Sequence, residues 1–413
     1  MPTSSGHGRS RQLCFIFIIN DIYDFIIRNR GALNPLSCGQ STGLRMSFTY
    51  LITGGAGFIG RHLCAELLAA GAQVRVLDSL VPQVHADNEP SLPQGIEFLE
   101  GDVRDTDLLD RALTGVDAVF HLAAEVGVGQ SMYEIVRYVG GNDLATATLL
   151  ERLANHPVQR LVVASSMSVY GEGMYRSPDG ERHGAVRRIA RAADGFWDPV
   201  APDGRSLGPI PTYETKQVDL ASIYALTKYM QERSCQIFGG AYGVEVVALR
   251  LFNVFGAGQA LSNPYTGVLA NFGARLLNGQ PPLVFEDGQQ RRDFVHVRDV
   301  ACAFRLAMES PRAVGHTINI GSGHSYTIRG VAELLAEAMG VPEIAPMMLD
   351  KARAGDIRHC FADIGKAREL IGYRPRYLLE DSLDELAQWI RASRAMDRGE
   401  DARQQLEARG LVT

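Results

Sequence analysis

The sequence predicts an α/β protein with a parallel, doubly wound sheet, because short apolar runs alternate with helix-compatible stretches over most of the chain. The first run, at 50–52, leads into a loop with glycine at every third position, Gly54, Gly57 and Gly60, and a helical stretch follows. A second apolar run occupies 73–77. The three glycines let the turn tighten, let the backbone approach a pyrophosphate and let the helix pack on the strand. This segment therefore predicts a dinucleotide-binding (Rossmann) fold.

The same alternation continues toward the C-terminus. Apolar runs predict further strands at 96–99, 118–122 and 161–163. Helices are predicted between and after these strands, at 108–113, 143–153, 329–339 and 382–392. Small residues follow the strand at 118–122, where they let the backbone pass close to a cofactor.

The predicted cofactor is NAD. Asp78 ends the second predicted strand, where a carboxylate accepts hydrogen bonds from the adenosine ribose and repels the 2′-phosphate of NADP. Ser79 and Leu80, which follow, are not basic. A solvated aspartate in a turn is the alternative interpretation. Besides Asp78, the residues expected at the cofactor are Gly54, Gly57, Phe58, Ile59, Gly60, Asp102, Val103, Leu122, Ala123 and Ala124.

Tyr224 and Lys228 stand four residues apart in a proline-free stretch, so they share one face of a helix. On spacing alone, an ordinary amphipathic helix would be the better interpretation. However, the apolar run at 161–163 also delivers Ser166 and Ser168 to a strand end, where α/β enzymes build their sites. A free tyrosine has a pKa of about 10, and a neighbouring ammonium favours its phenolate. Together these features predict that Tyr224 takes a proton from a sugar hydroxyl.

The motifs TGGAGFIG, HLAA, SSMSVYG and YALTK, in this order from Met46 onward, resemble those of extended short-chain dehydrogenase/reductases. Within that superfamily they resemble the sugar-nucleotide epimerase/dehydratase group. The resemblance implies that Tyr224 is the catalytic base, that Lys228 lowers its pKa and holds the nicotinamide ribose, and that Ser166 binds the reacting hydroxyl. It also implies that Asn142 lies at the cofactor. It further implies a homodimer joined through helices, one of which bears Tyr224.

The same resemblance implies a smaller, interleaved C-terminal domain that binds a nucleotide sugar, dTDP- or UDP-linked. Arg292 and Arg353 come from distant segments, and guanidinium groups match phosphate oxygens in pairs, so the two arginines suit a diphosphate. The alternative is that they are surface ion-pair partners. The residues expected at the substrate are Ser166, Ser168, Tyr224, Asn253, Phe285, Arg292, Arg353 and Asp356.

The residues after Ser166 favour epimerisation over elimination. Dehydratases of this group carry Asp and Glu directly after the catalytic hydroxyl, whereas Met167 and Ser168 stand here. A 4-epimerase needs only the Tyr, Lys and Ser set, retained NAD, and room for a 4-keto sugar to turn over before the hydride returns to its opposite face. The sequence therefore predicts an isomerase, a nucleotide-sugar 4-epimerase.

A finer resemblance concerns the substrate. Segments 125–139, 165–175, 259–268 and 406–412 resemble the branch of these epimerases that acts on dTDP-L-rhamnose. This resemblance implies interconversion of dTDP-L-rhamnose and dTDP-6-deoxy-L-talose. The alternatives are a UDP-glucose/UDP-galactose 4-epimerase and, from another class, an NAD-binding regulatory protein without catalysis.

Composition narrows the remaining possibilities. The net charge of -6 and the lack of a basic tract argue against nucleic acid as a partner. The six cysteines form no CxxC pair, which favours a reduced, cytoplasmic compartment and gives no support to a metal site. The apolar run at 13–19 is too short to cross a membrane.

Met46 opens the dinucleotide-binding pattern directly, so we expect residues 1–45 to be a non-native or disordered extension. The proline-rich insertion at 172–217 is expected to be a loop over the active site, and a disordered excursion is the alternative interpretation. The charged segment 397–409 is expected to be a solvated helical face. The expected domains are a Rossmann domain at 46–251, a substrate-binding domain at 252–293 and 321–395, a return to the Rossmann domain at 294–320, and a helical tail at 396–413.

Overall fold

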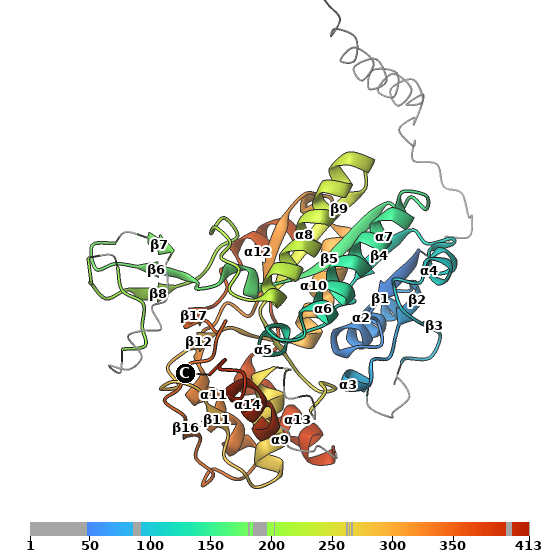
Figure 1. The fold of residues 1–413 in the computed structure, drawn as a ribbon. Coiled ribbons are helices and arrows are strands. Elements are labelled where there is room, and N and C mark those ends of the chain that lie inside the picture. Colours follow the sequence, from blue (N-terminus) through green and yellow to red (C-terminus); the bar gives the residue numbers. More distant parts are fainter. Residues whose placement is uncertain are drawn as a thin grey trace, which may run out of the picture. The chain divides into compact units, whose positions relative to one another are not determined.

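Seven parallel strands form the largest sheet of the chain, in the order β14-β9-β5-β4-β1-β2-β3 (Figure 1). The strands are β1 (Thr49–Thr53), β2 (Gln73–Asp78), β3 (Glu97–Glu100), β4 (Ala118–His121), β5 (Arg160–Ser166), β9 (Glu245–Leu251) and β14 (Thr317–Ile320). This sheet confirms the predicted doubly wound α/β fold.

The computed structural model describes residues 48–85, 92–180, 182–184, 196–201, 203–261, 263, 265, 267–393 and 399–412. The extension expected over residues 1–45 lies outside the described residues. Among the described helices, none is both long and apolar enough to cross a membrane.

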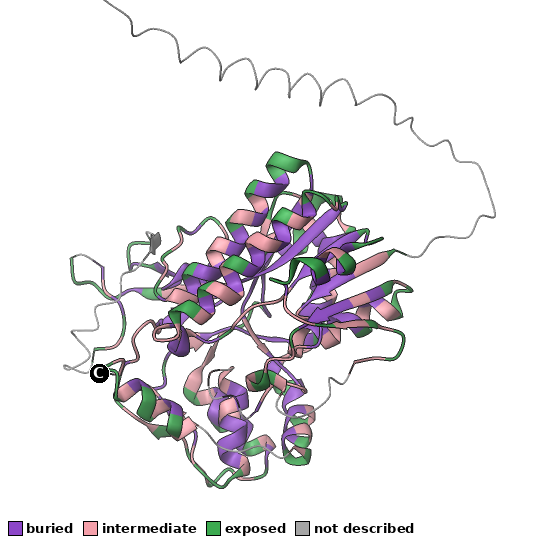
Figure 2. Cartoon of the chain, turned by 45° about the vertical axis from the view of Figure 1, so that its right-hand side comes forward, coloured by how far each residue is buried: buried purple, intermediate pink, exposed green. Residues whose placement is uncertain are grey.

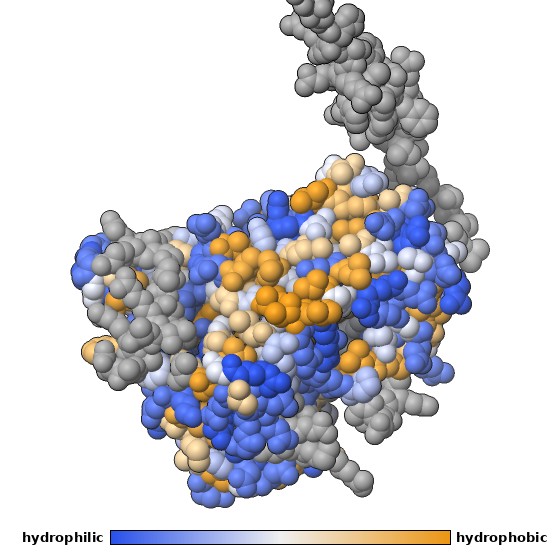
Figure 3. All heavy atoms as spheres, in the orientation of Figure 1, coloured by the Kyte–Doolittle hydropathy of each residue, from blue (hydrophilic) through white to orange (hydrophobic). Residues whose placement is uncertain are grey.

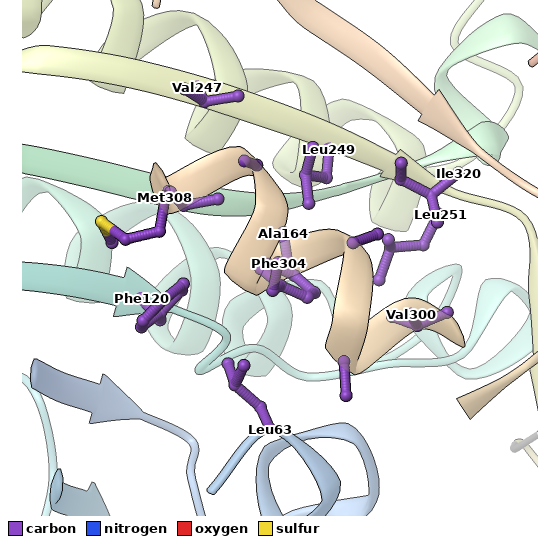
Figure 4. Packing of buried hydrophobic residues seen from close by; sticks show 14 of the residues in the cluster. Leu63, Phe120, Ala164, Val247, Leu249, Leu251, Val300, Phe304, Met308 and Ile320 are labelled. Atoms are coloured by element: carbon purple, nitrogen blue, oxygen red, sulfur yellow. The ribbon is translucent and has the colours of Figure 1, made fainter. Parts of the chain in front are cut away.

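Helices cover both faces of the large sheet, because its central strands are apolar on both sides. Leu51 and the next residue, Ile52, are both fully buried but belong to different cores. The Ile52 core packs on helices α2 (Phe58–Ala69) and α10 (Val297–Glu309); the Leu51 core packs on α4 (Thr106–Leu113), α7 (Ala145–Leu153) and α8 (Ile223–Tyr242). Figure 4 shows Phe304 of α10 between side chains of several strands.

Side chains cap several helices where the sequence turns from strand to helix. Asp105 accepts a hydrogen bond from Leu108 N at the start of α4, and Ser222 accepts one from Ala225 N at the start of α8. Gly243, in the left-handed conformation, ends α8.

Figure 2 shows the central strands buried and the helices exposed on their outer sides. The other short helices are α3 (Pro82–His85), α5 (Val128–Ser131), α6 (Ile135–Tyr138), the π-helix η1 (Val139–Leu144), η2 (Met167–Tyr170), η4 (Pro311–Ala313) and α12 (Gly365–Ile371).

A separate apolar core holds the smaller sheets and helices of the C-terminal half. Its helices are α9 (Val268–Leu277), α11 (Ile328–Ala338) and α13 (Leu379–Ala392). The small sheets are β10 (Asn253–Phe255) with β13 (Phe294–His296), β11 (Leu283–Val284) with β16 (Met347–Met348), and β12 (Arg291–Arg292) between β15 (Tyr326–Thr327) and β17 (His359–Cys360). Segment 294–320 adds α10 and β14 to the large sheet. The exact domain limits stay a prediction.

The structure of the insertion at 172–217 differs from the expected loop over the active site. Where the sequence suggested a loop over the active site, strands β6 (Met174–Arg176), β7 (Arg182–Gly184) and β8 (Gly208–Ile210) form an antiparallel sheet (Figure 1). None of its described residues lines the cavity described below. The insertion is attached instead to the residues on both sides of β17, since Arg358 N donates to Glu172 and Thr212 N donates to Phe361 O.

A buried ion pair joins α8 to the sheet and gives a prediction on stability. Arg250 and Glu232 are 2.6 Å apart and almost fully buried. Glu232→Ala leaves the Arg250 charge buried without its partner, so we expect the free energy of unfolding to fall by about 3–5 kcal/mol. Urea unfolding measures it. Glu333→Ala, which removes an exposed ion pair with Arg329, is the control and should cost about 0.5 kcal/mol or less. Equal losses in the two variants would contradict the prediction.

Candidate active site

A cavity of about 1890 Å³ lies at the carboxyl ends of the large sheet and is also bordered by the C-terminal half. All but one of the residues expected at the cofactor and the substrate line it. They are Gly54, Gly57, Phe58, Ile59, Gly60, Asp78, Asp102, Val103, Leu122, Ala123, Ala124, Ser166, Ser168, Tyr224, Lys228, Asn253, Phe285, Arg292, Arg353 and Asp356. The exception is Asn142.

The glycine loop leaves no room for side chains at two of its positions. Gly54 has φ +72°, and a Cβ there would lie 2.7 Å from Ala123 N. A Cβ on Gly60 would lie 2.5 Å from Gly54 O. Helix α2 begins directly after Gly57, and no side chain caps its first N–H groups. These open donors and the close backbone approach fit a dinucleotide pyrophosphate.

The Asp78 carboxylate faces the cavity beside this loop. It accepts hydrogen bonds from Ala56 N and Leu80 N, both at 3.0 Å. Because each carboxylate oxygen has a second lone pair, Asp78 can also accept from two ribose hydroxyls. The Asp102 carboxylate, by contrast, is held by Arg104 at 2.7 and 2.9 Å, and this contact lowers the pKa of Asp102.

Asn142 does not line the cavity, although its neighbour Gly141 does, and its expected place at the cofactor stays a prediction. It is fully buried in the π-helix η1. Its amide accepts from Glu125 N at 2.6 Å and donates to Glu125 O and to Thr227 Oγ1 on α8. All of its polar atoms are thus used inside the protein, so Asn142 ties the segment after β4 to α8.

Tyr224 lies in the first turn of α8, where Ser131 Oγ accepts from its backbone N–H at 3.0 Å. Burial raises the pKa of Tyr224, and a hydrogen bond with the Ser166 hydroxyl opposes that rise. Ser166 Oγ accepts from Ser168 Oγ at 2.9 Å and from Ser168 N at 3.2 Å. With its acceptor sites used by Ser168, the Ser166 hydroxyl is left to donate toward the phenol.

Lys228 follows one turn later and is buried. Burial lowers the pKa of Lys228 to about 8, and its Nζ donates to Gln231 Oε1 at 2.7 Å. Gln231 is held in turn by Thr146 Oγ1 at 2.8 Å. In the protein by itself, burial outweighs the Ser166 hydrogen bond and the pKa of Tyr224 is raised. The expected lowering of this pKa by Lys228 stays a prediction.

The five residues expected at the nucleotide come together at the other side of the cavity. The Arg353 guanidinium lies 4.9 Å from the Phe285 ring centroid, and Asp356 is 3.0 Å from Arg353 and 3.3 Å from Arg292. Arg292 is buried, so it is not a surface ion-pair partner. Arg353 Nε and Asn253 Oδ1 are buried and have no hydrogen-bond partner among the described residues. Unsatisfied atoms of this kind are the groups that a polar ligand would satisfy.

Several lining residues were not among the predicted site residues, and three of them contact one another. Tyr133, Tyr265 and Gln405 line the cavity, and the two tyrosine hydroxyls are 2.6 Å apart, with Gln405 Oε1 3.1 and 3.2 Å from them. Gln405 belongs to helix α14 (Gly399–Glu407). A solvated face was expected at 397–409, and Asp401 and Gln404 are exposed as expected, whereas Ala402 and Leu406 on the same helix are buried. Their i, i+4 spacing was the available signal.

Comparison with known proteins agrees with this geometry. Residues 50–188 and 198–321 match the NAD dependent epimerase/dehydratase family. The chain is 33% identical over 347 residues to a dTDP-L-rhamnose 4-epimerase of Burkholderia thailandensis, which covers 82% of this chain and 94% of that protein. It is 31% identical over 359 residues to a UDP-glucose 4-epimerase of Halalkalibacterium halodurans, with 82% and 94% covered.

Solved structures show the same fold. A UDP-glucose 4-epimerase of Thermotoga maritima with UDP-glucose has a TM-score of 0.69 and 30% identity, over 84% of this chain and 99% of that one. A UDP-glucuronic acid 4-epimerase of Bacillus cereus in complex with UDP-glucuronic acid and NAD has a TM-score of 0.70 and 26% identity, over 84% and 99%. The chain belongs to the NAD-dependent epimerase/dehydratase family, and its cofactor is NAD.

Proposed function

We propose that the protein is a nucleotide-sugar 4-epimerase that interconverts dTDP-L-rhamnose and dTDP-6-deoxy-L-talose. The observation that carries the proposal is the meeting of Ser166, Tyr224 and Lys228 in one cavity with the glycine loop, while Met167 stands where a dehydratase carries an acid. The similarity to the Burkholderia protein supports the choice of substrate.

The cavity residues account for proton transfer. When bound, NAD supplies reversible oxidation at carbon 4 of the sugar and a positive charge. In the protein by itself, Ser166 donates a hydrogen bond toward Tyr224. With the sugar bound, the Ser166 hydroxyl would turn and donate to the oxygen on carbon 4 instead, which orients that hydroxyl beside Tyr224. Tyr224, as phenolate, takes the proton of that hydroxyl while a 4-keto sugar forms, and it returns the proton when the keto group is reduced. The Lys228 ammonium favours the phenolate and donates to the nicotinamide ribose.

The arginine side of the cavity accounts for substrate binding. We propose that Arg353, whose buried Nε has no partner among the described residues, and Arg292 hold the diphosphate. Asn253 would donate to it through its side-chain NH2 group. Phe285, under the Arg353 guanidinium, borders the base. Asp356 keeps both guanidinium groups in place and accepts from the ribose. Met167, which is buried at the cavity wall, suits the methyl group of a 6-deoxy sugar.

The base is tested by Tyr224→Phe. We expect kcat to fall by about 10² to 10⁴-fold, since no other group at this point can take the proton, while NAD stays bound. Stopped-time NMR of the sugar and the absorbance of bound NAD measure the two effects. Tyr242→Phe removes an exposed hydroxyl from the same helix and should leave kcat unchanged. Full turnover by Tyr224→Phe would refute the assignment.

The substrate is tested by incubation with dTDP-L-rhamnose, without added cofactor, followed by NMR of the sugar. We expect dTDP-6-deoxy-L-talose to appear, because the epimerase retains its NAD. UDP-glucose is incubated in parallel, since a UDP-glucose 4-epimerase is the second candidate, supported by the similarity to the Halalkalibacterium enzyme. Turnover of UDP-hexoses alone would replace the proposed substrate. No turnover of either sugar by protein that binds NAD would favour a regulatory, non-catalytic role.

We also propose a homodimer, because apolar side chains are exposed on neighbouring helices. Figure 3 shows apolar side chains gathered over α6 and α8. Val136 is 87% exposed and Ile237 63% exposed, which is costly for a monomer. The other exposed apolar residues on these helices and on η1 are Ile135, Val139, Leu144, Leu226 and Tyr242. A two-fold axis between two copies would bury this face against itself.

The dimer is tested with the double variant Val136→Glu and Ile237→Glu. Charges that face each other across a two-fold interface should dissociate it, so we expect the mass from light scattering to halve. Met347→Glu changes an exposed apolar residue on β16, away from α6 and α8, and should leave the mass unchanged. A monomeric unmodified protein, or a double variant that stays dimeric, would contradict the proposal.

A further inference from the structure

Residues 399–412, which we call the C-terminal strap, border the cavity with helix α14 and then pair with the segment that carries Arg353. Arg353 and Val412 form an antiparallel bridge, and Ala354 N donates to Leu411 O at 2.8 Å. The strap thus fixes the backbone of Arg353, whose guanidinium lines the cavity.

A second set of contacts attaches the strap to the segment after β4. Leu406 is buried and lies beside Gly129, where an added Cβ would be in ordinary van der Waals contact with the leucine side chain, at 3.4 Å. The Arg409 guanidinium lies 4.3 Å from the ring centroid of Tyr133, and Gln405 accepts from the tyrosine hydroxyls. The strap therefore connects the Rossmann side of the cavity to its arginine side.

The contacts of the strap do not include the residues that we expect to hold NAD. The glycine loop, Asp78 and Lys228 have their hydrogen bonds with other parts of the chain. By contrast, the strap reaches Arg353 directly, and Lys351 Nζ lies 2.8 Å from Glu407 Oε1. Loss of the strap would therefore free the Arg353 segment and open the cavity wall without removing a cofactor contact.

We propose that the C-terminal strap is a substrate-positioning element, which holds Arg353 for the phosphates of the nucleotide sugar and closes the cavity with Gln405, Tyr133 and Tyr265. The inference rests on the proposed function, since the ligand it concerns is a nucleotide sugar. The strap determines the affinity for the substrate, whereas Tyr224, Lys228 and Ser166 determine the rate at which the bound substrate reacts.

The test compares the unmodified protein with a variant that lacks residues 399–413 and with Leu406→Asp, which places a charge at the contact with Gly129. Calorimetry measures the Kd for dTDP and for UDP, and kinetics separate KM from kcat. We expect KM and the nucleotide Kd to rise about tenfold or more in both variants, because Arg353 is no longer held. kcat at saturation should change less than about threefold, and bound NAD should be unchanged.

Gln404→Ala is the control, because Gln404 is exposed on the same helix and does not line the cavity. It should leave KM and Kd unchanged. If either variant folds and holds NAD but keeps the original KM and Kd, the inference is overturned; if the truncated variant does not fold, Leu406→Asp decides. If the unmodified protein binds neither dTDP nor UDP, the proposed function fails, and the inference with it.

Discussion

The position of α8 depends on one buried ion pair. Glu232 and Arg250 lie 2.6 Å apart, and Ser165 Oγ donates to the same carboxylate at 2.7 Å. Ser165 directly precedes Ser166 at the end of β5, and Glu232 lies one helical turn after Lys228. The ion pair thus fixes the helix that carries Tyr224 and Lys228 against the strand that carries Ser166. Its desolvation cost is offset because the carboxylate is fully engaged by the arginine and the serine.

With α8 in place, burial determines the charge state of the basic side chains near Tyr224. Burial lowers the pKa of Lys228 to about 8 and that of His121 to about 3, so at neutral pH the lysine is the cation and the histidine is neutral. His121 can then join Thr53 and Thr146 in hydrogen bonds instead of repelling the lysine. One positive charge therefore remains beside Tyr224, which is the charge that a phenolate base needs.

Local features of the sequence were sufficient for strands β1 to β5 of the large sheet, the glycine loop and the Tyr224 helix, because spacing within a few residues determines each of them. Features that depend on distant contacts were not predictable. The role of Asn142 depends on a hydrogen bond to Thr227 across two helices. Because most residues of 397–409 are polar or charged, little in the sequence indicated that Ala402 and Leu406 are buried and pack α14 against the protein. In the insertion, β6 pairs with β8, which lies more than 30 residues later in the sequence. The proline and glycine content of the segment does not indicate such a pairing.

The insertion, although outside the cavity, contacts the segment that holds Arg292. Arg292 donates to the carbonyls of Ile357 and Arg358. The Arg358 guanidinium is itself almost fully buried and binds Asp198 of the insertion as well as Glu286 and Asp287.

Three carboxylates accept four hydrogen bonds from this one buried guanidinium, so the chain that presents these carbonyls has little freedom to shift. Glu286 adopts a left-handed backbone, φ 56°, which a non-glycine residue keeps only where the surrounding contacts impose it. The orientation of Arg292 toward the cavity is therefore determined by the ion pairs of Arg358, which lie outside the cavity lining.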